Sequence, residues 1–158
     1  MARSTKPGLA HLIRRLKSVK AKDIMTREVV TTSESTQLAD VAELFIKKRI
    51  TGLPVVGKKG KLVGIITATD LFLLMDMIES GDVVEDGQVA VPNPTVKFAM
   101  STEVIRIKKS TTLHEIISVM QYRNRRTLPV MEGARLVGVV GWRDVLKHFY
   151  AAVKELNL

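Results

Sequence analysis

Residues 64–70 read Gly64-Ile65-Ile66-Thr67-Ala68-Thr69-Asp70, a stretch that predicts the end of a β-strand and the start of a helix. β-Branched residues precede Thr67, and an apolar run over residues 71–74 follows Asp70. A Thr and an Asp three positions apart can cap a helix by accepting its first unpaired N–H groups. They can also hold a polyol and an anion, because a helix start offers N–H donors and partial positive charge. One corner of this kind does not separate the two roles.

The corner occurs twice, because the chain contains an internal repeat. Residues 23–30 align with residues 98–105, an offset of 75 positions (98 minus 23). The same offset pairs Leu53-Pro54-Val55 with Leu128-Pro129-Val130. One residue is then lost in the following turn, after which Leu62-Val63-Gly64 matches Leu136-Val137-Gly138 and Asp70 matches Asp144. The sequence therefore predicts two copies of one supersecondary unit.

Each copy predicts the order β-α-β-β-α. The first copy has strands over 29–31, 55–56 and 62–66, and the second has strands over 104–106, 130–131 and 136–140. The helix after the first strand is marked by apolar spacing at Leu38, Val41, Ala42 and Phe45, and in the second copy at Leu113, Ile116, Ile117 and Met120. Each sheet has one open face, so two copies must stack to bury it. The predicted fold class is α+β, with two stacked repeats.

The predicted organisation has five parts. We expect a basic leader and amphipathic helix over residues 1–19, repeat 1 over 20–80, a connector over 81–95, repeat 2 over 96–150 and a tail over 151–158. The connector contains the acidic stretch 82–86 and Pro92-Asn93-Pro94, which cannot be regular throughout.

The repeat resembles the cystathionine-β-synthase (CBS) domain pair, or Bateman module, over residues 20–150. The resemblance rests on Asp23-Ile24-Met25-Thr26 near the start of the repeat, Thr51-Gly52-Leu53-Pro54-Val55-Val56 in its middle and Gly64–Leu71 at its end. It implies two repeats stacked about a pseudo-twofold axis, with two clefts between them. It also implies that the corner Asp takes ribose hydroxyls of an adenosine compound and that the hydroxyl residue three positions earlier takes phosphate.

The resemblance implies a first cleft built on the corner of repeat 1. Its ligand-binding residues would be Ile65, Ile66, Thr67, Thr69 and Asp70, faced by Met100, Ile105, Arg125, Arg126 and Thr127. A carboxylate accepts bidentately from a cis-diol, and Arg pairs with phosphate oxygens more specifically than Lys does.

A second, weaker cleft would use Arg143 and Asp144, faced by Met25, Val30, Thr51 and Gly52. Here the sequence departs from the family pattern, because Gly141 stands at the position of Thr67. The hydroxyl is lost, although Arg143 could replace it as a phosphate partner. We therefore expect the first cleft to be the better ligand site.

Structural alternatives remain for these residues. Asp70 and Asp144 could be helix caps in a module without ligand. Arg123, Arg125 and Arg126 could form an exposed rim, and the methionines at 25, 100, 120 and 131 could be core filling.

Composition describes an ordinary globular chain. Of 158 residues, 46% are hydrophobic and only 4% aromatic, so the core is built of aliphatic residues and Met. No apolar run approaches the roughly 20 residues that span a bilayer, and the N-terminus lacks the pattern of a signal peptide. The absence of Cys excludes disulfides and thiolate chemistry and fits a cytoplasmic location.

The net charge of +9 is unevenly distributed. Residues 1–22 carry seven Lys or Arg and no acid, residues 23–95 a net −4 and residues 96–150 a net +6. Leu9, Leu12, Ile13 and Leu16 form one apolar stripe of a helix. This helix could lie over the main domain and bury the stripe. Alternatively, Arg14, Arg15, Lys17 and Lys20 could dock on nucleic acid or membrane.

No catalytic or metal-binding motif is readable. The three His residues have no acid or Cys at metal-ligand spacing, and no phosphate loop or nucleophile elbow occurs. We expect no enzyme activity and no required cofactor, with Mg²⁺ only if ATP is bound. The predicted function is a freestanding regulatory module that binds AMP, ADP or ATP, signals occupancy to an unidentified regulated protein and forms a homodimer. The alternative is a structural adaptor that docks through its basic N-terminal helix on nucleic acid, membrane or an acidic partner.

Overall fold

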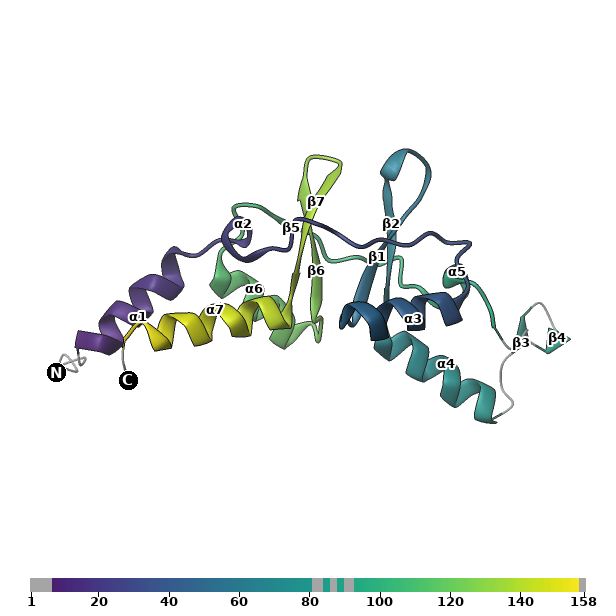
Figure 1. The fold of residues 1–158 in the computed structure, drawn as a ribbon. Coiled ribbons are helices and arrows are strands. Elements are labelled where there is room, and N and C mark those ends of the chain that lie inside the picture. The colour runs from purple at the N-terminus through teal and green to yellow at the C-terminus, as the bar shows by residue number, and fades with distance from the viewer. Residues whose placement is uncertain (1–6, 81–83, 86–87, 90–92, 157–158) are drawn as a thin grey trace. The chain divides into compact units, whose positions relative to one another are not determined.

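The computed structural model describes residues 7–80, 84–85, 88–89 and 93–156, and the chain forms two compact units (Figure 1). Unit 1 contains Met1–Val29 and Ile105–Leu158, and unit 2 contains Val30–Val104. Each unit therefore combines the body of one repeat with the opening segment of the other repeat. The predicted α+β class is confirmed, and the boundary between units differs from the boundary between repeats because the opening segments are exchanged.

Unit 2 is built on the hairpin of β1 (Gly52–Val56) and β2 (Leu62–Thr67), joined by the short 3₁₀ helix η1 (Lys58–Gly60). The helices are α3 (Leu38–Lys48), α4 (Ala68–Ser80) and α5 (Val96–Ala99). The strands pair antiparallel with Gly52 opposite Thr67 and a bulge between Val55 and Val56. Their core cluster is aliphatic apart from one aromatic residue, and contains Leu38, Val41, Phe45, Leu53, Val55, Ile66, Leu74 and Val96.

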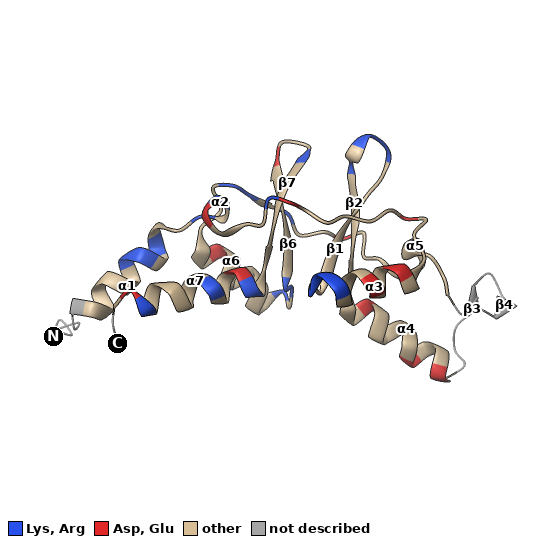
Figure 2. Ribbon diagram, in the orientation of Figure 1, with Lys and Arg blue, Asp and Glu red and all other residues tan. Residues whose placement is uncertain are grey.

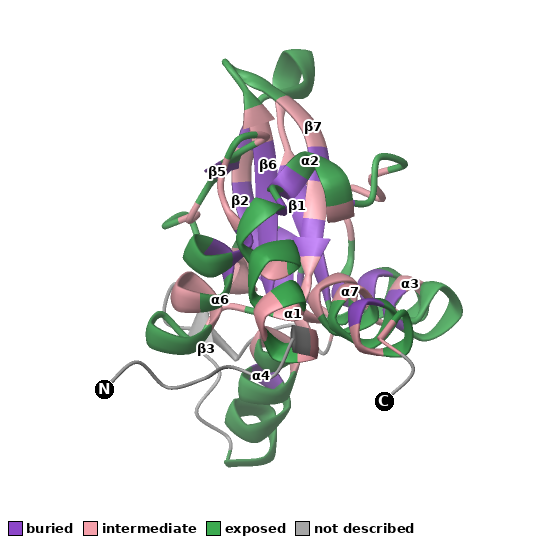
Figure 3. Ribbon diagram, turned by 90° about the vertical axis from the view of Figure 1, so that its left-hand side faces the viewer, coloured by how far each residue is buried: buried purple, intermediate pink, exposed green. Residues whose placement is uncertain are grey.

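Unit 1 has the same plan with a third strand. It contains α1 (Pro7–Ser18), α2 (Ala21–Ile24), β5 (Ile107–Lys108), α6 (Leu113–Tyr122), β6 (Thr127–Glu132), β7 (Arg135–Gly141) and α7 (Trp142–Lys154). β5 pairs parallel with β6, and β6 pairs antiparallel with β7. The core cluster contains Ala21, Met25, Ile107, Ile116, Leu128, Val130 and Val140. Figure 3 shows burial concentrated on the strands, whereas α4 is exposed along most of its length.

The opening segments lie along the last strand of each hairpin, and a glycine permits the contact. Thr26 and Val139 exchange backbone hydrogen bonds of 2.8 and 3.0 Å, and a Cβ on Gly138 would lie 2.6 Å from Met25 Sδ. In unit 2, Ser101 and Ile65 exchange backbone hydrogen bonds of 2.9 Å each, and a Cβ on Gly64 would lie 2.9 Å from Met100 Sδ. The repeat alignment therefore corresponds to equivalent packing in the two units.

The first strand of each copy was predicted at the wrong residues. In unit 2 the strand expected over 29–31 is reduced to an isolated parallel bridge between Thr32 and Val55. In unit 1 the strand expected over 104–106 is found two to three residues later, as β5 (Ile107–Lys108). Pairing with the hairpin decides the position, because a short parallel edge strand has few hydrogen bonds of its own to fix it.

The expected N-terminal helix is confirmed as α1, which packs against α6 and α7 of unit 1 (Figure 1). Leu12 and Leu16 are half-buried, whereas Leu9 and Ile13 stay exposed. Arg15 Nη2 donates to Glu155 Oε1 at 2.9 Å. The helix thus covers part of the unit with one side of its apolar stripe.

The expectation of an irregular connector falls mostly outside the described residues. Within the connector, β3 (Val84–Glu85) pairs antiparallel with β4 (Gln88–Val89). Among the described residues, no helix has the length and apolar character needed to cross a membrane.

Candidate functional site

The corner of unit 2 places a carboxylate at the first turn of α4. β2 ends at Thr67 and α4 begins at Ala68, so Asp70 is the third residue of the helix. Asp70 Oδ2 accepts hydrogen bonds from the Thr67 N–H (2.7 Å) and from Thr67 Oγ1 (3.0 Å). The carboxylate thereby satisfies a donor at the helix start, as in one half of a capping box. Both residues are half-buried.

The second oxygen of Asp70 is not used in this arrangement. Asp70 Oδ1 accepts no hydrogen bond from any residue that the structure describes. Since Oδ2 is fixed by two donors, the carboxylate is held in one orientation with Oδ1 available as an acceptor. The Thr67 hydroxyl donates to Asp70, and its oxygen can still accept.

The corner of unit 1 keeps the carboxylate but engages both of its oxygens. Asp144 Oδ2 accepts from the Gly141 N–H at 2.8 Å, and Asp144 Oδ1 accepts from Thr26 Oγ1 at 3.4 Å. Thr26 was not among the residues predicted for the second cleft, although the alignment of Thr26 with Ser101 pointed to it as part of the repeat. The two corners are therefore chemically different, in agreement with the divergence that Gly141 indicated.

The other residues predicted for the first cleft are divided between the units. Met100 is in unit 2, where its side chain packs at Gly64, next to the buried Ile65 and Ile66. Thr69 is exposed on the first turn of α4. Ile105, Arg125, Arg126 and Thr127 belong to unit 1. There, the Arg126 carbonyl accepts from the Trp142 N–H at 3.0 Å and Thr127 pairs with Gly141. Their role in the first cleft stays a prediction.

The residues predicted for the second cleft show the reciprocal division. Thr51 and Gly52 are in unit 2, where the Thr51 carbonyl accepts from the Ala68 N–H at 2.9 Å and Gly52 pairs with Thr67. Val30 packs against the core of unit 2. Met25 is buried, and it belongs to unit 1, as Asp144 does. Arg143 lies over the Trp142 ring, with Cζ 5.4 Å from the ring centroid.

The described residues contain no group of three His, Cys, Asp or Glu side chains that could hold a metal ion. Each corner offers a carboxylate acceptor at the start of a helix, and the corner of unit 2 also offers the Thr67 hydroxyl.

Comparison with protein families identifies the repeat. The CBS domain model matches residues 21–76 and again residues 96–151. The chain belongs to the CBS domain family. The two matched segments end within α4 and α7, the helices that follow the corners at Thr67 and Gly141, so both corners lie inside the matched residues.

Relatives and solved structures agree with this assignment. The chain is 33% identical over 129 residues to uncharacterized protein MJ1225 of Methanocaldococcus jannaschii. The alignment covers 80% of this chain and 46% of that relative. The chain thus spans less than half the length of that relative. The CBS domain pair of protein MJ0100, solved in complex with 5′-methylthioadenosine and S-adenosyl-L-methionine, is 25% identical with a TM-score of 0.69 over 84% of this chain and 97% of that one. CBSX2, solved in complex with AMP, is 25% identical with a TM-score of 0.68 over 86% of this chain and 97% of that one.

Proposed function

We propose that this CBS pair is a regulatory ligand-sensing module that binds an adenosine nucleotide at the Thr67–Asp70 corner and signals occupancy to a partner protein. The observation that carries the proposal is the state of Asp70, whose Oδ2 is fixed by Thr67 while Oδ1 accepts from no described residue. An oriented carboxylate with one available oxygen is suited to the vicinal hydroxyls of ribose. The adenosine ligands of the MJ0100 pair and of CBSX2 support this ligand class.

The phosphate end of the ligand would use the start of α4. The first N–H groups of a helix lack partners within the helix and carry partial positive charge, so they favour an anion. The Thr67 hydroxyl can also contribute, provided that its proton turns from Asp70 to the phosphate. The Asp144 corner is a weaker candidate, because Gly141 has no hydroxyl and Thr26 occupies the second oxygen of Asp144.

The decisive variant is Asp70→Asn, which separates ligand binding from helix capping. The Asn carbonyl oxygen can still accept from the Thr67 N–H, but an NH₂ group replaces the available oxygen and cannot accept from a ribose hydroxyl. We expect thermal-shift titrations with AMP, ADP, ATP and S-adenosylmethionine to raise the melting temperature of the native protein. Saturation at 100 times Kd adds about 2.7 kcal/mol to the free energy of unfolding. Asp70→Asn should abolish the shift while the ligand-free protein stays folded.

Asp144→Asn is the matched control, since it makes the same chemical change at the other corner. It should reduce the shift less than Asp70→Asn does. If Asp144→Asn has the larger effect, the corners are assigned in the wrong order. If no adenosine ligand changes the melting temperature, the proposed function is wrong.

Self-association is part of the proposal. α4 exposes Phe72, Leu73 and Met75 by 65, 58 and 54%, and α7 exposes Leu146 and Tyr150 by 53 and 63%. Exposed apolar residues gathered on single helices mark interaction surfaces more often than scattered ones do. We expect these two helices to form the contacts of a homodimer.

A second candidate function rests on α1, which carries Arg14, Arg15 and Lys17 and no acidic residue. Leu9 and Ile13 remain 49 and 39% exposed beside these cations. This combination suits an adaptor that docks on an anionic partner such as nucleic acid or a membrane surface. Salt-sensitive binding to duplex DNA or anionic vesicles, together with no response to adenosine ligands, would favour the adaptor over the sensor.

A further inference from the structure

Unit 1 contains a shallow hollow of about 390 Å³ between α2, the turn before α6 and the start of β7. It is lined by Met25, Arg27, Lys109, Arg135, Leu136 and Val137, all of which belong to unit 1. None of these residues belongs to the α4 or α7 corner, although Met25 was also predicted for the second cleft. The volume lies within the roughly 300–1,000 Å³ typical of small-molecule pockets.

Three cationic side chains from three separate segments surround the hollow. Arg27 follows α2, Lys109 follows β5, and Arg135 opens β7. Backbone contacts fix two of these segments together, because the Lys22 N–H donates to the Lys109 carbonyl at 3.1 Å. Arg27 Nη2 donates to the Lys22 carbonyl at 3.4 Å. The convergence of positive charge is thus set by the backbone of the unit.

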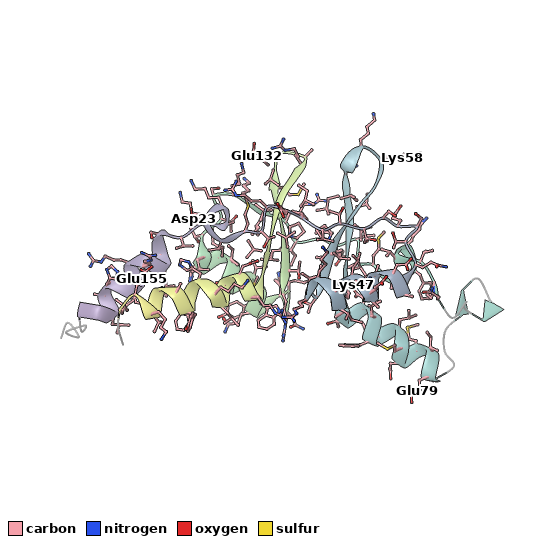
Figure 4. The ribbon with its side chains drawn as sticks, viewed as in Figure 1. Asp23, Lys47, Lys58, Glu79, Glu132 and Glu155 are labelled. Carbon is pink, nitrogen blue, oxygen red and sulfur yellow. The ribbon has the colours of Figure 1, made fainter. Side chains whose placement is uncertain are left out.

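The acidic groups nearby neutralise only part of this charge. Glu132, labelled on the hairpin in Figure 4, forms an ion pair with Lys109. The Lys109 hydrogen bond and its charge, with a smaller effect of Arg135, lower the pKa of Glu132 below its usual value. Asp23 on α2 accepts from the Lys20 N–H at 2.9 Å, which turns its carboxylate to its own helix start. Figure 2 shows the basic residues beside α2 and on this hairpin.

The equivalent positions of unit 2 lack this charge. By the repeat alignment, Arg27 corresponds to Thr102, Lys109 to Glu34 and Arg135 to Lys61. Three cations in unit 1 therefore correspond to one cation, one anion and one neutral residue in unit 2. Met25, which lines the apolar floor of the hollow, has the same residue type at its equivalent position, Met100. The positive hollow is consequently a property of unit 1 and is not required for the common fold.

We propose that this hollow binds a small phosphate monoester, with Arg27, Lys109 and Arg135 around the phosphate and Met25, Leu136 and Val137 beneath the ester group. Guanidinium groups recognise phosphate oxygens in a bidentate manner, and the side-chain stems of the cations leave room for an apolar body. The site shares no residue with the Thr67–Asp70 corner and stands whether or not that corner binds an adenosine nucleotide.

The test is a titration followed by amide shifts in ¹H–¹⁵N NMR spectra of the ¹⁵N-labelled protein. The probes are phenyl phosphate, inorganic phosphate and phenol, with chloride adjusted to keep the ionic strength constant. We expect saturable shifts at the lining residues with phenyl phosphate, weaker binding of inorganic phosphate and none of phenol. Arg135→Gln should weaken the binding of phenyl phosphate by about tenfold or more, a loss of affinity within the range that charge-assisted hydrogen bonds contribute.

Lys61→Gln is the matched control, because it removes the same charge from the equivalent position of the other hairpin. It should leave the affinity for phenyl phosphate unchanged. Absence of saturable shifts, or equal weakening by Lys61→Gln and Arg135→Gln, would overturn the site. Equal affinity for inorganic phosphate and phenyl phosphate would overturn the assigned role of the apolar floor. A spectrum of Arg135→Gln with native dispersion shows that a loss of binding does not come from unfolding.

Discussion

Replacement of Gly138 by Ala tests the packing of the exchanged segment in unit 1. The added Cβ would lie 2.6 Å from Met25 Sδ, 3.0 Å from Met25 Cγ and 3.2 Å from Met25 Cβ. Nonbonded heavy atoms prefer separations of about 3.5–4.0 Å, so Met25 must move by several tenths of an ångström or more. Its backbone is restrained, because the adjacent Thr26 is hydrogen-bonded in both directions to Val139.

The expected cost follows from this geometry. Overpacking a filled core costs about 1–3 kcal/mol. Met has three rotatable side-chain bonds and can relieve part of the overlap, but Met25 is only 9% exposed and packs in the core cluster of unit 1. In a protein of this length, each 1 kcal/mol changes the melting temperature by about 2–4 °C. We therefore expect Gly138→Ala to lower the melting temperature by about 2–12 °C.

The energetic coupling between positions 138 and 25 can be measured by urea unfolding of four proteins. These are the native chain, Gly138→Ala, Met25→Ala and the double variant. Met25→Ala removes the two closest contacts of the new Cβ, those with Sδ and Cγ, and keeps the contact with Cβ at 3.2 Å. Alone it costs about 2–5 kcal/mol. In that background Gly138→Ala should cost clearly less than it does beside Met25, because only the 3.2 Å contact with Cβ remains. A Gly138→Ala cost that is the same with Met25 and with Ala at position 25 would refute the reasoning.

The other repeat provides an internal control with the opposite expectation. A Cβ on Gly64 would lie 2.9 Å from Met100 Sδ and also 2.9 Å from the Ser101 carbonyl oxygen. The backbone oxygen remains when Met100 is shortened. Gly64→Ala should therefore stay destabilising in a Met100→Ala background, and its full rescue there would contradict the observed approach of the two backbones.

The remaining predictions concern stability in acid and self-association. The pKa of Glu115 is lowered because the carboxylate accepts hydrogen bonds from the Thr112 N–H and hydroxyl. Its contribution to stability is present above the unfolded-state pKa of about 4.5 and is lost as pH falls through the lower folded-state value. Glu115→Gln keeps a capping side chain without the titration, so urea unfolding below pH 4.5 should show a shallower loss of stability for the variant than for the native protein. Phe72→Ser and Tyr150→Ser should each shift the mass measured by light scattering towards that of the monomer. A Ser replacement of the half-buried Leu12 should leave the mass unchanged. The proposed homodimer would be contradicted if both variants stayed dimeric or if the native protein were a monomer.

Much of the fold could be predicted from the sequence because the information is local and occurs twice. The spacing of Leu38, Val41 and Phe45 predicts α3, and all three residues are buried in the core of unit 2. The Thr112–Glu115 spacing predicts a capping box, which the structure forms with bonds of 2.8 and 3.2 Å. Conversely, the first strand of each copy was misplaced, because two-residue strands and single bridges depend on the partner strand for their position.

The candidate site could be predicted only in part. The sequence identified Asp70 and Asp144 as equivalent residues and showed that Gly141 lacks the hydroxyl of Thr67. It could not show that Thr26 bonds to Asp144 while Ser101, its counterpart, leaves Asp70 Oδ1 without a described donor. Residues 118 positions apart form that bond, and its presence depends on how an exchanged segment lies against a strand.

The sequence by itself determined the repeat, the α+β class and the residue types at both corners, since periodicity, glycines and caps act within a few positions of the chain. Only the tertiary structure decided which segments share a unit. The opening segment of each repeat pairs with the last strand of the other hairpin, at Gly64 and Gly138, where close backbone approach needs the absence of a Cβ. That exchange brings Arg27 beside Lys109 and Arg135. Long-range hydrogen bonding and burial decide such neighbours, and these act between residues that no local pattern connects.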